Sequence, residues 1–199
     1  MNETAKSRFS LLLCLLLGLA LAACTSQSAE PPLKGARIGG PFSLVNQDGK
    51  PVTDRDFLGR YRIVYFGFAH CPDVCPTDLA ALGQALKRFE KSDPERAAKV
   101  QPVFITVDPE RDTPPVVKEF VSAFHPRLVG LTGTVPQVTA AAKAHAVYFS
   151  KGDPLPGGGY GMDHMRTMVL MDPKGDPIVL LPGDKGVDAV AAELERWVK

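Results

Sequence analysis

The stretch that decides the fold reads Tyr61-Arg62-Ile63-Val64-Tyr65-Phe66-Gly67-Phe68, followed at once by Ala69-His70-Cys71-Pro72-Asp73-Val74-Cys75-Pro76. Its first half is β-branched and aromatic, and it is apolar on both faces toward its end, which predicts a central buried strand. Pro76 suits the first position of a helix and disfavours helical geometry at the residue before it. The sequence therefore predicts a helix from Pro76 to about Phe89, with two cysteines in the loop between strand and helix.

Further elements are expected on both sides of this unit. The patterns predict a small N-terminal hairpin around residues 46–50, a second buried strand over 102–107 and helices over 113–124 and 135–145, with a short strand (128–131) and an edge segment (146–149). A hairpin of 167–171 and 178–181, joined by a turn at 172–175, and a helix over 186–198 close the chain. This order predicts an α/β, thioredoxin-like fold over residues 37–199, with a central mixed sheet flanked by helices and an N-terminal hairpin extension.

The N-terminus indicates export. Lys6 and Arg8 precede an apolar run over 9–23, which is the layout of a secretory signal and is too short to span a bilayer comfortably. The run ends in Leu21-Ala22-Ala23-Cys24, which resembles the lipobox of bacterial lipoproteins. We therefore expect a signal peptide over 1–23, lipidation of Cys24 and a flexible tether over 24–36, so that the protein is lipid-anchored outside the cytoplasm in the bacterial cell envelope. An ordinary signal peptide cleaved nearby is the alternative.

The charge and the cysteine count limit the classes of function that the chain can have. The chain of 199 residues has a formal net charge of +1 and no basic run, so nothing points to a nucleic-acid partner. Of its four cysteines, Cys14 falls in the signal peptide and Cys24 at the lipidation site. Cys71 and Cys75 remain in the exported domain.

Such a pair has three interpretations, namely a reactive dithiol, a metal site or a structural disulfide. A helix N-terminus is expected to lower the thiol pKa and to expose the sulfurs, which favours the first two. A disulfide that encloses three residues would restrain little of the unfolded chain. The two sulfurs are therefore expected either to bind a metal ion or to take part in thiol-disulfide exchange.

The spacing favours a metal. Thioredoxin-type oxidoreductases use Cys-x-x-Cys, and the extra residue here leaves room for an ion. Because the ends of the two parallel strands and the start of the antiparallel strand share a sheet edge, we expect the Cys71–Cys75 pair, Asp108 and His164 to converge. Two thiolates and an imidazole suit both Cu(I) and Cu(II). Zinc accepts the same atoms, but a structural zinc site normally has a fourth protein ligand.

Three ordered motifs carry a family resemblance. They are Gly67-Phe68-Ala69-His70-Cys71-Pro72-Asp73-Val74-Cys75-Pro76-Thr77, then Thr106-Val107-Asp108-Pro109-Glu110-Arg111-Asp112-Thr113-Pro114, then Asp163-His164 with Leu170-Met171-Asp172-Pro173-Lys174-Gly175. The chain resembles the Sco/SenC proteins, which assist assembly of the dinuclear copper centre of cytochrome c oxidase. The resemblance covers nearly the whole mature chain. It implies a thioredoxin-like fold and copper ligation by Cys71, Cys75 and His164.

The leading hypothesis is thus a membrane-tethered copper metallochaperone, whose Cys71–Cys75 pair binds Cu(I) or Cu(II) with His164 and loses its metal on oxidation to a disulfide. Its expected partners are the copper-bearing subunit of cytochrome c oxidase, a second periplasmic copper chaperone or thiol reductant, and the membrane. The alternative is an enzyme, a thiol-disulfide oxidoreductase that reduces the cysteines of the oxidase copper site. A thiol peroxidase is disfavoured because no Thr-x-x-Cys is present.

The other histidines have simpler interpretations. His70 is expected to shape the cysteine loop or to tune the thiols rather than to bind metal. His125 and His145 are expected to be structural, and Asp163 is a candidate acceptor that orients His164.

Two further groups of residues stand near the predicted site. The segment from Asp108 to Asp112 is either a turn and cap cluster or a contributor near the copper. Among the four methionines around His164, Met162 is the best candidate for an auxiliary contact, whereas Met165, Met168 and Met171 are expected to pack.

Overall fold

The structure is a computed structural model that describes residues 29–154 and 158–199. The predicted signal peptide over 1–23 and the predicted lipidation site Cys24 lie outside the described residues. Residues Pro31–Lys199 form one compact unit. The Leu33 amide donates a hydrogen bond of 3.0 Å to the Ile178 carbonyl, so this part of the predicted tether is held against the domain.

Seven strands form the main sheet, in the order β2-β1-β5-β4-β3-β8-β9. They are β1 (Ser43–Asn46), β2 (Pro51–Thr53), β3 (Tyr61–Gly67), β4 (Val100–Thr106), β5 (Val129–Thr132), β8 (Met168–Met171) and β9 (Pro177–Leu180). β3 and β5 each pair parallel with β4, whereas β8 pairs antiparallel with β3. The mixed sheet predicted from the sequence is confirmed, and the N-terminal hairpin β1–β2 extends it through β5.

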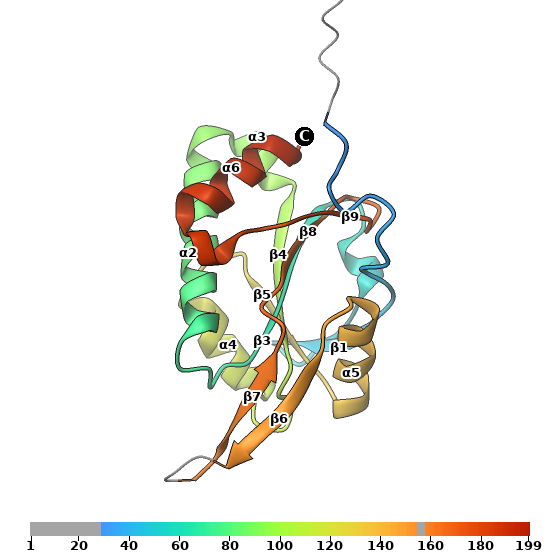
Figure 1. Ribbon diagram of the computed structural model, residues 1–199, viewed down its shortest axis with the longest axis vertical. Helices are drawn as coiled ribbons and strands as arrows, with labels where there is room; N and C mark the ends of the chain where they lie inside the picture. Colours follow the sequence, from blue (N-terminus) through green and yellow to red (C-terminus); the bar gives the residue numbers. More distant parts are fainter. Residues whose placement is uncertain (1–28, 155–157) are drawn as a thin grey trace, which may run out of the picture. The chain divides into compact units, whose positions relative to one another are not determined.

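Helices cover both faces of this sheet. They are α2 (Val74–Ser92), α3 (Pro94–Ala98), α4 (Pro114–Ser122), α5 (Val135–Ala144) and α6 (Val187–Trp197), with short 3₁₀ turns η1 (Asp54–Phe57) and η2 (Gly183–Lys185). Figure 1 shows α2, α4 and α6 on one side of the sheet and α5 on the other. Between them β3 is buried along six of its seven residues, as its apolar sequence predicts.

Helix α2 begins two residues earlier than predicted, at Val74 rather than Pro76. Proline is tolerated in the first helical turn because the first amides of a helix have no partner within the helix. The expectation that Pro76 would keep Cys75 out of the helix is therefore wrong. Cys75 lies in the first turn, on the face that packs against the sheet.

The segment around His164 also differs from the prediction. Strands β6 (Phe149–Pro154) and β7 (Tyr160–His164) form a separate two-stranded hairpin, where the sequence predicted only an edge segment over 146–149. The missed strands contain Gly, Asp and Pro and lack apolar alternation, so no strand pattern was visible. In Figure 1 this orange hairpin projects beyond the main sheet.

Candidate metal centre

Cys71 and Cys75 lie at the N-terminal end of α2, directly after β3, and both are free thiols. Cys71 is half-buried, whereas Cys75 is fully buried among the residues of the core. Burial raises the pKa of the Cys75 thiol to about 12. The expectation that the helix N-terminus would expose and acidify both sulfurs is wrong for Cys75, because desolvation by the packed sheet outweighs the helix terminus.

The cysteine loop is held in a fixed conformation by its own backbone and by the neighbouring strand. The Cys75 amide donates a hydrogen bond to Cys71 Sγ at 3.4 Å. Both sulfurs therefore lie at the N-terminus of α2. The buried Asp112 carboxylate accepts hydrogen bonds from the Ala69 amide at 2.8 Å and from the Thr106 hydroxyl at 2.6 Å. These contacts fasten the loop to the end of β4.

His164, at the end of β7, reaches the same place from the far part of the sequence. Its Nε2 lies 3.5 Å from Cys75 Sγ, across 89 positions of the chain. The predicted convergence of Cys75 and His164 is confirmed.

The tautomer of His164 follows from its second contact. Nδ1 lies 3.1 Å from the Met165 carbonyl, which can only accept, so Nδ1 carries the proton. Burial lowers the pKa of His164 and keeps the imidazole neutral. Nε2 is then left with a free electron pair directed at the sulfur, which is the state a metal ligand requires. The acceptor that orients His164 is thus the Met165 carbonyl, and the expected Asp163 acceptor is wrong.

An open groove lies next to Cys71 and His164. Its volume is about 330 Å³, and its lining includes Cys71, Met162, His164 and Phe68. Phe68 meets the imidazole of His164 edge to face, with ring centroids 5.8 Å apart, and so limits its rotation. Met162 lines this groove, which supports its interpretation as an auxiliary contact.

The remaining methionines pack as expected or lie on the surface. Met168 and Met171 are buried in the core, and Met165 is 46% exposed.

The other histidines have structural roles. The buried His145 hydrogen-bonds the Ala141 carbonyl, and Nδ1 of the buried His125 accepts from the Arg127 amide. Half-exposed His70 pairs with Asp112 through Nδ1 at 3.1 Å, so it shapes the cysteine loop.

His70, Asp108 and Asp112 form a second group whose ligand atoms lie within 4.8 Å of one another. Their oxygens are already used, because Asp112 holds the cysteine loop and Asp108 binds Arg111 and accepts from the Tyr160 hydroxyl at 2.9 Å. The turn and cap interpretation of this segment therefore accounts for its contacts. Through Tyr160 it also anchors β7, the strand that carries His164.

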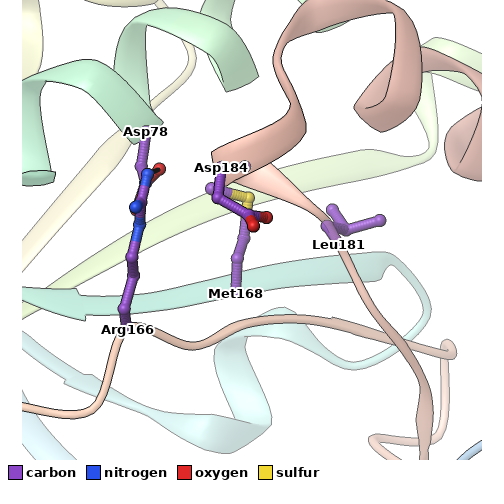
Figure 2. Close-up of a pocket in the computed structure, with 6 residues that line it drawn as sticks. Asp78, Arg166, Met168, Leu181 and Asp184 are labelled. Carbon is purple, nitrogen blue, oxygen red and sulfur yellow. Dashed lines mark hydrogen bonds and ion pairs between the residues drawn. The ribbon is translucent and has the colours of Figure 1, made fainter.

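Two residues of the site were missed from the sequence. Asp78 was not assigned to the site from the sequence, and its side chain is only 2% exposed. Figure 2 shows it pointing from α2 toward Arg166, which rises from the connection after β7 and pairs with it. A carboxylate three residues after Cys75, on the apolar face of the helix, was the available signal.

The donor set fits copper. Two cysteine sulfurs and one neutral imidazole nitrogen combine soft and borderline ligands, which suit Cu(I) and Cu(II). The described residues supply no third cysteine to complete a four-ligand structural zinc site.

Comparison with known proteins identifies the family of the chain. The sequence profile of SCO1/SenC matches residues 30–199. The chain belongs to the SCO1/SenC family. It is 45% identical over 142 residues to protein SenC of Rhodobacter capsulatus, covering 70% of this chain and 61% of SenC. The chain spans about half the length of the first curated SCO relatives it matches.

Solved structures extend the SCO1/SenC assignment. ScoI of Bradyrhizobium japonicum, solved with copper bound, is 40% identical, with a TM-score of 0.72 over 80% of this chain and 99% of that one. The copper prediction agrees with this relative. The thioredoxin domain of a Bacteroides vulgatus thiol-disulfide oxidoreductase is 16% identical, with a TM-score of 0.53 over 81% of this chain and 96% of that domain. This similarity confirms the predicted thioredoxin-like fold of the SCO1/SenC chain.

None of the helices in the part of the SCO1/SenC chain that the structure describes is long and apolar enough to cross a membrane.

Proposed function

We propose that this protein is a copper metallochaperone that binds copper through Cys71, Cys75 and His164 and passes it to the copper-bearing subunit of cytochrome c oxidase. The observation that carries the proposal is the 3.5 Å approach of His164 Nε2 to Cys75 Sγ, since nothing in the local sequence requires it. Membership of a family with relatives solved with copper bound supports the choice of metal.

The protonation states of Cys75 and His164 determine how copper binding depends on pH. Cys75 must give up its thiol proton to become a ligand, whereas His164 is already neutral with Nε2 free. Loading therefore releases a proton and is favoured by rising pH.

The redox state of the same two sulfurs would control copper binding. Oxidation of the two thiols forms one S–S bond and transfers two electrons and two protons to a thiol-disulfide partner, which leaves no thiolate to hold copper. A thiol reductant of the envelope would restore binding.

The proposed location is the bacterial cell envelope, outside the cytoplasm. It rests on the exported N-terminal pattern and on Cys24 as the lipid-bearing residue. A lipid on Cys24 would keep the copper domain near the membrane that holds the oxidase. A second copper chaperone of the envelope is the proposed donor.

The test is spectroscopic. The reduced protein with Cu(II) should show thiolate-to-copper charge transfer, and electron spin resonance should show nitrogen and sulfur ligands. Cys71→Ser with Cys75→Ser should abolish the absorption band, and His164→Ala should shift it and weaken binding. If the double cysteine variant bound as much copper as the wild type, the proposal would be wrong.

A thiol-disulfide oxidoreductase is the second candidate. Cys71 is the more accessible sulfur and accepts a hydrogen bond from the Cys75 amide, an arrangement that suits an attacking thiolate. This activity does not need His164. If the protein is a metallochaperone, His164→Ala should abolish copper delivery to the oxidase but spare thiol exchange with a disulfide substrate. If assembly of the oxidase copper centre were unchanged in this variant, the oxidoreductase would be favoured.

A further inference from the structure

Asp78 is a buried carboxylate next to the metal centre. It follows Cys75 by three residues, so both side chains lie on the same face of α2. A buried charge is tolerated only when its oxygens are paired. Asp78 Oδ2 accepts from the Tyr65 hydroxyl at 3.0 Å and from Arg166 Nε at 2.7 Å, and Oδ1 accepts from Arg166 Nη2. Arg166 supplies the opposite charge.

Arg166 follows His164 by two residues, in the connection from β7 to β8. Two parallel hydrogen bonds from the planar guanidinium fix both the distance and the orientation of the pair. The two side chains meet head to head between the helix and the connection (Figure 2). The segment immediately after His164 is thereby fastened to the helix that carries Cys75.

The ion pair lies in a part of the chain that has little backbone hydrogen bonding to the main sheet. Within the described residues, β6 and β7 pair with each other and form no ladder with the seven-stranded sheet. Residues 165–167 belong to no strand, and the Met165 amide donates a hydrogen bond of 3.0 Å to the Tyr148 carbonyl. The position of His164 over Cys75 therefore depends on side-chain contacts.

A second carboxylate lies close to the ion pair. A pocket of about 210 Å³ adjoins it and is lined by Met168, Leu181 and Asp184 in addition to the pair. In Figure 2 Asp184 lies across this pocket from Arg166, and its carboxylate points away from the guanidinium. Asp78 is therefore the carboxylate that holds the guanidinium of Arg166 in this structure.

We propose that the Asp78–Arg166 ion pair is a positioning strap that sets the separation of His164 Nε2 from Cys75 Sγ and so determines how firmly the third ligand engages copper. The copper part of this inference rests on the proposed function, whereas the positioning part concerns the metal-free protein. Asp78 and Arg166 touch no ligand atom of copper in this assignment. They act through His164.

The experiment compares Arg166→Met, which keeps the aliphatic stem, with Asp78→Asn plus Arg166→Met, which leaves no buried unpaired charge. The control is Arg127→Met, because Arg127 also forms an ion pair with a carboxylate of α2, donating through Nε and Nη2 to Glu90 Oε1 near the other end of the helix. Arg166→Lys tests rescue, since lysine restores the charge but not the two-point geometry.

The first readout is metal-free. Nitrogen NMR of selectively labelled histidine in the reduced full chain should show a single His164 tautomer, with the proton on Nδ1, in the wild type and in Arg127→Met. Both strap variants should show tautomer averaging, and Arg166→Lys should be intermediate. A single tautomer in both strap variants would overturn the proposal.

The second readout is copper affinity, measured by chelator competition. Each strap variant should bind about tenfold more weakly than Arg127→Met, the loss typical of groups that support a metal-ligating histidine. In a His164→Ala background the same substitutions should have no further effect. An equal loss in that background would mean that the pair serves only the fold and would refute the strap. If His164→Ala alone left copper binding unchanged, the ligand assignment would fail, and the NMR result would still decide the positioning role.

Discussion

The cysteine loop and the β6–β7 hairpin supply ligands to one site, but they are built in opposite ways. The loop joins β3 to α2, and β3 is paired on both sides, by β4 and by β8. Every residue of the hairpin strands is half-buried or exposed. The hairpin is held by a few side-chain contacts, chiefly Tyr160 with Asp108 and Arg166 with Asp78.

This difference separates folding from metal binding. Changes at the cysteine loop disturb the core, so they should alter stability and copper binding together. Changes at the hairpin should alter the third ligand while the core stays intact, because few buried apolar contacts connect the two. The following predictions test this separation.

The largest effect is expected from Gly67→Ala, at the end of β3. A Cβ there would lie 2.9 Å from Cys75 Sγ and 3.0 Å from Tyr65 Cε1, inside the packed core. Overpacking of this kind costs about 2 kcal/mol. Urea unfolding should show this loss of stability. The matched control is Gly161→Ala in β7, where a Cβ meets nothing within 4 Å and the stability should be unchanged or slightly higher. Equal losses in both variants would contradict the separation.

Alkylation of the reduced, metal-free protein should distinguish the two sulfurs. A pKa of about 12 lowers the thiolate fraction of Cys75 about 1,000-fold against an ordinary thiol, and its higher nucleophilicity recovers only part of this. We expect Cys75 in a Cys71→Ser variant to react with iodoacetamide at least about 50-fold more slowly than Cys71 in a Cys75→Ser variant. Similar rates, followed by mass spectrometry at pH 8, would show that Cys75 is open to solvent.

The same pKa shift predicts a pH dependence of stability. The folded-state pKa of Cys75 is raised above its unfolded value of 9.0, so the folded protein keeps a proton that the unfolded chain loses. The stability that this group contributes is fully present below pH 9 and declines as the pH rises toward about 12. Denaturant midpoints across this window should fall less in Cys75→Ser than in the wild type.

A smaller effect, confined to the hairpin, is expected from Tyr160→Phe. It removes the 2.9 Å hydrogen bond to Asp108 but keeps the ring, over which the Arg111 guanidinium carbon lies 3.7 Å from the centroid. Loss of one such bond costs about 1 kcal/mol. Hydrogen exchange should quicken about fivefold in β6 and β7 while β3 is unchanged. Tyr148→Phe is the control because Tyr148 is 69% exposed. Faster exchange in β3 would show that hairpin and core open together.

The smallest effect is expected from His70→Ala. Its side chain is 48% exposed, and such surface pairs contribute about 0–1 kcal/mol. Asp112 still accepts from Ala69 and Thr106 after the substitution, so the loop keeps its anchors. Copper affinity should stay within about threefold of the wild type. A loss as large as that of His164→Ala would make His70 a ligand.

The order of the main strands and helices was predictable because each has a local cause. Apolar runs predicted β3 and β4, and the turn at Asp172-Pro173-Lys174-Gly175 predicted the β8–β9 hairpin. The start of α2 was missed by two residues, since a proline in the first turn leaves the true boundary undetermined. Strands β6 and β7 were missed because they have no apolar face to bury.

By itself, the sequence determined that two cysteines lie between a buried strand and a helix, and its motifs indicated the family and His164. Only the tertiary structure decided the chemical state of each group. Packing against the sheet buries Cys75, the Met165 carbonyl selects the His164 tautomer, and the Asp78–Arg166 pair joins the two regions. These states depend on desolvation and on contacts between distant segments, and no local pattern encodes either.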